Sequence, residues 1–191
     1  MEENILTEEE KRETAMMRAL SRQRAEYIYY ILKGAKDMGI DYHEFARKGL
    51  IEQGVLRAER LVKGKTFKTV RDFFDAAAPE KMRKAFMMRG EYIGDKLQVH
   101  CGYCPLVEAW ENLGLPADEV RDLCEVIMSG DMQSYNSMPG IHCEWIHSLA
   151  HGDGECMFEY TMRDEPDGDI DPGEVIKPKQ DRPCEAKRPE W

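Results

Sequence analysis

The chain has 191 residues, 34% of them charged, and its formal net charge is −10. This acidic balance argues against nucleic-acid binding, because phosphate contacts draw on a basic surface. No apolar run is long enough to cross a bilayer, and the acidic N-terminus lacks the apolar segment of a secretory signal. We therefore expect a cytoplasmic protein that binds neither nucleic acid nor membrane and buries one hydrophobic core.

Patterns typical of helices cover the first ninety residues. A capping box begins at Thr7, and the stretch to about Lys33 has no proline. Further helices are predicted from Asp41 to about Val62, from Thr69, and from Pro79. In the first helix the apolar positions recur at helical spacing and predict an amphipathic face. These positions are Met16, Met17, Leu20, Tyr27, Ile28 and Ile31.

A cluster of tyrosines in the same helix (Tyr27, Tyr29 and Tyr30) has two interpretations. It could line a ligand pocket, but such a stripe more often packs in the core or against another subunit. We therefore favour a packing role for these tyrosines.

Short strands and helices alternate in the second half. Lys96–Cys101 has strand character, and helices are predicted over residues 105–113 and 118–134. Residues 141–150 and 155–162 form the two strands of a predicted hairpin around Gly152-Asp153-Gly154. Alternation then places Cys143, Trp145, His147 and Leu149 on one face of the first strand, and Cys156, Phe158 and Tyr160 on one face of the second.

These elements predict an α+β fold, in which a helical N-terminal half packs on a small antiparallel sheet. We expect a single domain over residues 1–163, with a helical part up to residue 94 and a part rich in cysteine and histidine from residue 95. Residues 164–191 are predicted to form an extended or disordered acidic tail, which includes Cys184. Because the edges of a short sheet tend to pair, a homodimer is expected.

Cysteines and histidines are concentrated between positions 100 and 156, where five of the six cysteines and four of the five histidines lie. In a reducing compartment cysteines are thiols, metal ligands or buried small groups rather than disulfides. Cys101 and Cys104 form a Cys-x-x-Cys pair that could bind a metal or act as a redox pair. A zinc ribbon is not predicted, because only one such pair is present. The sequence still allows a metal site whose ligands come from a loop, a helix and a hairpin that meet only in the folded chain.

Three segments of this region resemble the L-2-amino-thiazoline-4-carboxylic acid hydrolase-like family. They are residues 101–110, the predicted helix with Cys124 and Asp131, and residues 149–158, which contain Gly152-Asp153, Cys156 and Phe158. The resemblance covers roughly residues 10–163. It implies an enzyme that hydrolyses a C–N bond of a small cyclic amidine, and it singles out Cys156 in the hairpin.

The hairpin also resembles the 4-vinyl-reductase domain, a small-molecule-binding module of bacterial sensors that is related in fold to a vesicle-tethering subunit. In the sensors, three cysteines and a glutamate hold zinc. Cys124 and Cys156 match two of these cysteines, whereas the third position falls near Ser148 and the glutamate near Trp145. This departure means that Cys143, His147, His151 or the Cys101/Cys104 pair would have to supply the missing ligands.

Two functions follow as hypotheses. In the enzyme, a thiolate (Cys104 or Cys124) attacks a small-molecule substrate, a histidine (His151 or His142) moves protons, and Asp131 holds the amidinium. A bound metal would instead activate water. Its expected ligands are Cys101, Cys104, Cys124 and Cys156, with zinc favoured over an iron–sulfur cluster. The alternative is a non-catalytic module that binds a small molecule or a metal.

Overall fold

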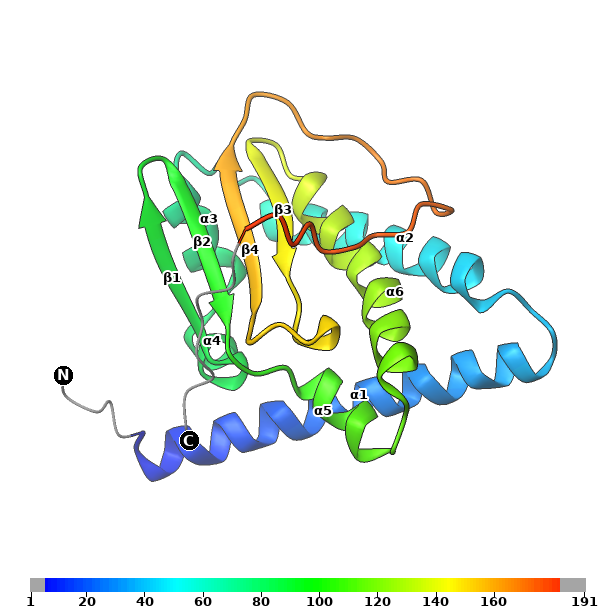
Figure 1. Cartoon of the computed structure of the whole chain (residues 1–191). Helices are drawn as coiled ribbons and strands as arrows, with labels where there is room; N and C mark the ends of the chain where they lie inside the picture. Colours follow the sequence, from blue (N-terminus) through cyan, green and yellow to red (C-terminus); the bar gives the residue numbers. More distant parts are fainter. Residues whose placement is uncertain (1–5, 183–191) are drawn as a thin grey trace.

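Helices fill the first part of the chain in the computed structural model, which describes residues 6–182. The capping box predicted at Thr7 begins the first helix, and the Asp41 side chain caps the second, as the sequence predicted. The third helix begins at the predicted residue, Thr69, where the structure adds a second capping box. Two further helices follow in the second half (Figure 1). The helices are α1 (Glu8–Asp37), α2 (Tyr42–Val62), α3 (Val70–Ala77), α4 (Glu80–Phe86), α5 (Pro105–Asn112) and α6 (Ala117–Asn136).

A four-stranded antiparallel sheet follows the order β1-β2-β4-β3 within residues 6–182. The α+β fold with a helical N-terminal half is therefore confirmed. One strand was not predicted, because the helical part was expected to reach residue 94. All but the first residue of β1 are exposed, so no apolar alternation marks this edge strand, which is defined by its pairing with β2. The strands are β1 (Met88–Ile93), β2 (Lys96–Cys101), β3 (Ile141–His147) and β4 (Cys156–Met162).

The hairpin between β3 and β4 differs from its prediction. β3 ends at His147 instead of residue 150, after a register irregularity between Trp145 and His147. A short 3-10 helix, η1 (Leu149–His151), follows, and Gly152 closes it with φ +86°. The predicted alternation therefore holds for Cys143 and Trp145 but stops before His147, because the backbone changes its course there.

Two clusters of buried side chains form the core. The first lies between the sheet and helices α2, α3 and α6, with Phe73 and Trp145 almost fully buried. The second joins α1, α5 and α6 around Trp110, whose indole N–H donates to the backbone oxygen of Ala25 at 3.1 Å. Helix α6 contributes to both clusters and therefore connects the sheet to α1.

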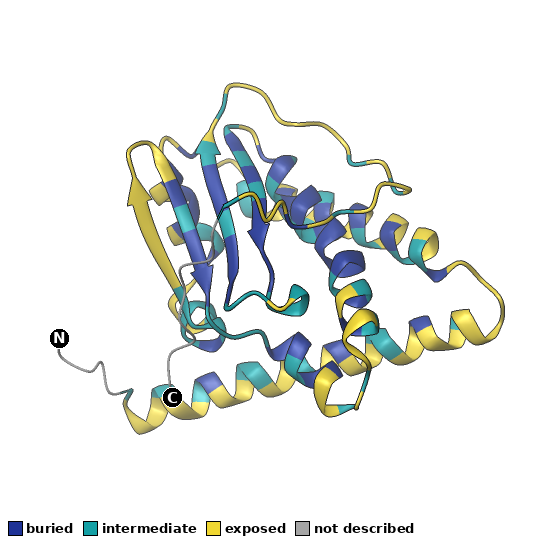
Figure 2. Cartoon of the chain, viewed as in Figure 1, coloured by how far each residue is buried: buried dark blue, intermediate teal, exposed yellow. Residues whose placement is uncertain are grey.

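The apolar face predicted for α1 does not face the core. The residues that α1 buries are Thr14, Ala25 and Leu32, whereas Met16 and Leu20 are exposed (Figure 2). Tyr27 and Tyr30 are exposed as well, so the core interpretation of the tyrosine cluster is wrong for these two residues. The helix packs against α4 and α5 through the smaller residues of its other face.

The tail contains no helix or strand up to residue 182, and it lies along the domain (Figure 1). The backbone N–H of Ile170 donates to the Gln133 side chain at 2.6 Å, and Lys179 and Gln180 donate to backbone oxygens of β3. Cys184 lies outside the described residues. None of the described helices is long and apolar enough to span a membrane.

Candidate functional site

The four cysteines predicted as metal ligands lie close together in the fold. Cys101 at the end of β2 is the register partner of Cys156 at the start of β4. Cys104 is the N-cap residue of α5, and Cys124 lies on α6. The pKa values of Cys101, Cys124 and Cys156 are each raised in part by the nearby Cys104 thiol. The β2–α5 turn, α6 and the start of β4 thus converge on one cluster, which we call the thiol cluster.

Residues at the start of the 3-10 helix after β3 contact the sulfur atoms of Cys156 and Cys124. The backbone N–H of Leu149 donates to Cys156 Sγ at 3.3 Å, and the Ser148 hydroxyl lies 3.9 Å from Cys124 Sγ. The backbone N–H of Ser148 donates to Asp153 at 2.8 Å, which fixes the turn. The turn residues therefore act as the support of the thiol cluster.

Burial raises the pKa of all four thiols in the cluster. For Cys104, hydrogen bonds from the backbone N–H groups of Val107 and Leu106 oppose this effect in part. The thiols are consequently protonated near neutral pH, whereas metal ligation requires thiolates. Among residues 6–182, no group of three or more His, Cys, Asp or Glu side chains is placed to hold a metal ion. The role of the four cysteines as zinc or iron–sulfur ligands therefore stays a prediction.

His151 and Asp131, the other predicted catalytic residues, are already paired. His151 Nε2 lies 2.9 Å from Glu125 Oε1, and its ring packs edge-on against Trp145. Asp131 forms an ion pair with Arg57, whose guanidinium also lies over the Tyr135 ring. No hydrogen bond between these described side chains joins Cys104, Asp131 and His151. The structure therefore brings Cys104 to the thiol cluster but does not assemble the predicted trio.

A cavity of about 790 Å³ lies beside the cluster, between the first half of α1 and the start of α5. We call it the α1–α5 cavity. Cys104 is the one thiol of the cluster among its lining residues. Apolar lining residues include Met87, Val107 and Leu149. Charged groups line the other side, namely Lys11, Arg18, Arg22, Lys84, Glu108 and Glu111.

Basic side chains outnumber carboxylates in this cavity. Arg22 is paired with a carboxylate, whereas Arg18 is not. Arg22 donates to Glu108 at 2.8 Å, and Tyr103 donates to the same carboxylate at 2.5 Å. Arg18 instead donates to the backbone oxygen of Ala85 and lies over the Tyr103 ring, with no ion pair to a described carboxylate. The cavity thus offers an uncompensated guanidinium to an anionic group. Sequence reasoning missed it, because its walls come from segments about eighty residues apart, and Cys104-Pro105 was the only signal.

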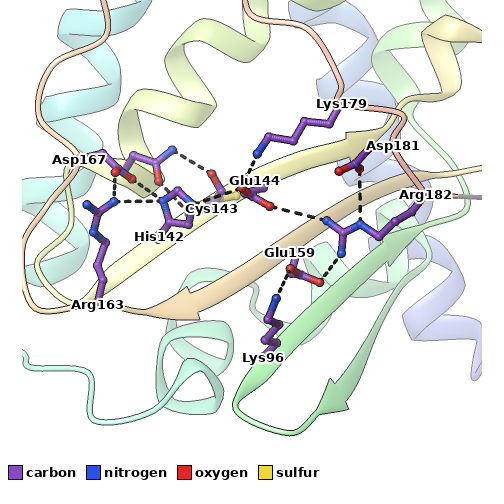
Figure 3. A network of polar contacts seen from close by, with 11 residues as sticks. Lys96, His142, Cys143, Glu144, Glu159, Arg163, Asp167, Lys179, Asp181 and Arg182 are labelled. Carbon is purple, nitrogen blue, oxygen red and sulfur yellow. Dashed lines mark hydrogen bonds and ion pairs between the residues drawn. The ribbon is translucent and has the colours of Figure 1, made fainter.

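Three further candidates from the sequence lie elsewhere. His142 is on the outer face of β3, where its ring lies 2.6 Å from Asp167 of the tail (Figure 3). Cys143 faces the first core cluster, and Asn136 bonds both the N–H and the C=O of its backbone. His147 is buried, neither ring nitrogen has a hydrogen bond within the described residues, and Nδ1 lies 3.6 Å from Asp153 Oδ2.

The tail neutralises buried acids on the outer face of the sheet (Figure 3). Glu159 is only 4% exposed and accepts hydrogen bonds from Lys96, Gln98 and, at 2.6 Å, Arg182. Burial alone would raise its pKa, but these hydrogen bonds outweigh burial and lower the pKa to about 2. Glu144 similarly pairs with Lys179. These contacts tie the end of the described tail to β3 and β4.

The Glu159 contacts predict acid sensitivity. Its pKa is lower in the folded chain than the ordinary value of 4.5, so its stabilisation is present above that pH and is lost as the pH falls towards 2. We expect a loss of up to about 3 kcal/mol over this range. Urea unfolding at a series of pH values should show a flatter dependence for Glu159→Gln. The exposed carboxylate variant Glu165→Gln is the control. Equal pH dependence in Glu159→Gln and wild type would contradict the prediction.

No protein-family model matches the sequence, and no curated protein matches it. Among solved structures, the chain is similar to a trafficking protein particle complex subunit 3 from Naegleria fowleri, whose crystal structure contains covalently bound palmitic acid. The identity is 9%, the similarity covers 78% of this chain and 99% of that chain, and the TM-score is 0.47. A similarity of this extent supports no transfer of ligand or partner to this chain.

Proposed function

We propose that this chain is a hydrolase-like enzyme that acts on a C–N bond of a small cyclic amidine, with the α1–α5 cavity as its substrate site. One observation carries the proposal. Cys104 lines this cavity at the N-terminus of α5, and two backbone N–H groups are directed at its sulfur. Such a position stabilises the thiolate as it forms. The resemblance of residues 101–158 to the L-2-amino-thiazoline-4-carboxylic acid hydrolase-like family supports the same reaction class.

The charges of the cavity suit a substrate that carries both a carboxylate and an amidine. Arg18 can bind a carboxylate, since its guanidinium forms no ion pair with a described acid and donates only to the backbone oxygen of Ala85. Glu108 and Glu111 present carboxylates to an amidinium in the same cavity. The apolar side chains around Cys104 lower the local polarity and so strengthen these charge interactions.

Because burial raises the pKa of the Cys104 thiol, the proposed reaction begins with the removal of the thiol proton. The basic amidine nitrogen accepts the Cys104 thiol proton, and the sulfur then adds to the amidine carbon. The ring C–N bond then breaks with its electron pair on nitrogen, which takes a second proton from the exocyclic amino group and leaves as a primary amine, while the carbon keeps its bonds to the imino nitrogen and to the Cys104 sulfur. Water then adds to this carbon and returns a proton to the departing Cys104. His151 and Asp131 are given no step, because His151 Nε2 pairs with Glu125, Asp131 pairs with Arg57, and neither residue lines the α1–α5 cavity.

Turnover of L-2-amino-thiazoline-4-carboxylic acid, followed by mass spectrometry of the ring-opened product, tests the proposal. We expect Cys104→Ser to lower kcat/KM by at least about 1,000-fold, since loss of a nucleophile removes the reaction path. Arg18→Ala should raise KM more than it changes kcat, because Arg18 contacts the part of the substrate that does not react. Cys143→Ala, outside the cavity, is the control and should retain kcat/KM. An active Cys104→Ser enzyme would contradict the role of this thiol.

A non-catalytic binding module is the second candidate. It is favoured by the burial of all four thiols in the cluster, which makes them weak nucleophiles at neutral pH. A rearrangement that brings the cysteines together would allow zinc or, less readily, an iron–sulfur cluster to bind. Metal analysis of anaerobically purified protein separates the candidates. Stoichiometric metal that is lost in Cys124→Ser, without turnover of the amidine, would favour the binding module.

A further inference from the structure

Much of α1 is exposed along the side that faces away from the domain (Figure 2), and exposed apolar side chains form a stripe along this helix. Met16, Leu20, Tyr27 and Ile31 are each 61–63% exposed, and Met38 is 78% exposed. At 3.6 residues per turn, these five positions fall within an arc of about 60°, opposite the buried Ala25. The stripe is about 33 Å long. A continuous apolar surface of this kind marks an interaction site.

The spacing of the stripe is symmetric. Met16 and Ile31 lie equally far from the midpoint between Gln23 and Arg24, and so do Leu20 and Tyr27. Two copies of α1 in antiparallel orientation about this midpoint would therefore place Met16 opposite Ile31 and Leu20 opposite Tyr27, whereas Met38 would lie beyond this contact, opposite Glu9. Such an arrangement is a two-fold interface, in which the same patch serves both copies.

An apolar groove adjoins one end of the stripe. It has a volume of about 430 Å³ and lies between α1 and α2, with Ile28, Ile31, Leu32 and Phe45 among its lining residues. In the antiparallel arrangement Met16 of the second copy lies opposite Ile31, at this groove. Methionine is flexible and fills irregular apolar gaps well. Each copy thus supplies both the groove and the side chain that fits it.

The charges at the two ends of α1 are also complementary. Residues 8–13 contain four glutamates against two basic residues, whereas residues 33–38 contain two lysines against one aspartate. An antiparallel pair places the acidic end of each helix beside the basic end of the other. It also aligns the two helix dipoles in opposite directions.

From the symmetry, the groove and the charges, we propose that the chain forms a homodimer in which the α1 stripe packs antiparallel against the α1 stripe of a second copy. The earlier expectation of a dimer rested on sheet edges, and the α1 stripe places the interface elsewhere. The edge strand β1 exposes the charged residues Arg89 and Glu91 beside Tyr92 and Ile93, so it presents a shorter apolar surface than the α1 stripe.

Sedimentation velocity at a series of protein concentrations tests the interface. We expect wild type to dimerise, and the double variant Leu20→Glu with Tyr27→Glu to weaken the dimer by about 100-fold or more, because it places carboxylates at the centre of an apolar contact. Ile93→Glu, at an exposed apolar position on β1, is the matched control and should leave the dimer intact. A monomeric wild type, or a dimer that is lost in Ile93→Glu and kept in the double variant, would overturn the proposal.

Disulfide trapping tests the orientation of the helices independently of the double variant. Gln23→Cys lies beside the symmetry axis, so mild oxidation should link two copies above the level seen for wild type. Met38→Cys is the control, because its two copies would lie about 40 Å apart in the antiparallel pair. Efficient linkage through Met38→Cys in place of Gln23→Cys would contradict the antiparallel arrangement.

Discussion

Substitution of Gly54 by alanine is expected to lower the free energy of unfolding by about 3 kcal/mol, because α2 and α6 cross in direct contact at this residue. A Cβ atom at position 54 would lie 2.4 Å from the backbone oxygen of Gly130 and 3.1 Å from the backbone nitrogen of Ser134. Both atoms belong to the α6 backbone, so no side-chain rotation relieves the overlap. The helices would have to move apart along their whole contact.

Urea unfolding followed by circular dichroism measures this effect, and α2 provides its own control. Gly49 lies in the same helix with open space around its Cβ position. Gly49→Ala is therefore expected to be neutral or stabilising by up to about 1 kcal/mol, because alanine favours the helix. Equal stability of the two variants would contradict the close crossing of α2 and α6.

The crossing also has a consequence for the site. Asp131 follows Gly130 on α6, and it forms the ion pair with Arg57 of α2 next to the contact. Cys124 lies two turns earlier on the same helix. A shift of α6 would therefore move Cys124 relative to Ser148 and disturb the thiol cluster. We expect Gly54→Ala to make the cluster thiols react faster with alkylating reagents, in parallel with its lower stability.

The variant Trp110→Ala is expected to cost about 3–5 kcal/mol, the range for removal of a large buried aromatic side chain. Trp110 is 1% exposed at the centre of the cluster between α1, α5 and α6, and its indole N–H satisfies the backbone oxygen of Ala25. Its loss would create a void and weaken the attachment of α1 to α5. The α1–α5 cavity, whose walls are these two helices, would lose its shape.

Trp110→Phe separates the contribution of the buried aromatic volume to stability from that of the indole hydrogen bond. It keeps most of the buried aromatic volume and removes the hydrogen bond, so it should cost less than the alanine variant. Urea unfolding of both variants, together with the KM of the amidine for the folded fraction, measures the effects. A cost below about 1 kcal/mol for Trp110→Ala would contradict the role of the second core cluster.

Local signals made the helices predictable. The capping boxes at Thr7 and Thr69 and the cap at Asp41 act within a few residues of the chain, so their effect is readable from sequence. Alternation likewise identified the buried face of β4, because Cys156 and Tyr160 pack on one side of the strand. Strand β1 gave no such signal, since only its pairing with β2 holds it in the sheet.

The direction of the apolar face of α1 shows why periodicity alone was insufficient. Spacing identified Met16, Leu20, Tyr27 and Ile31 as one face, but it carried no information on what that face contacts. The domain uses Ala25 on the opposite side, because small residues allow α5 to approach closely. The larger apolar side chains of α1 are exposed, and we propose that they contact a second copy of the chain.

The sequence by itself determined which residues can do chemistry and which segments are helical, because thiols, caps and periodicity are properties of neighbouring residues. Only the tertiary structure decided that Cys101, Cys104, Cys124 and Cys156 meet, and that only Cys104 among them lines the α1–α5 cavity. It also decided that burial keeps these thiols protonated and that the tail supplies Arg182 to Glu159. Burial and pairing of this kind depend on contacts between residues far apart in the chain, which no local pattern encodes.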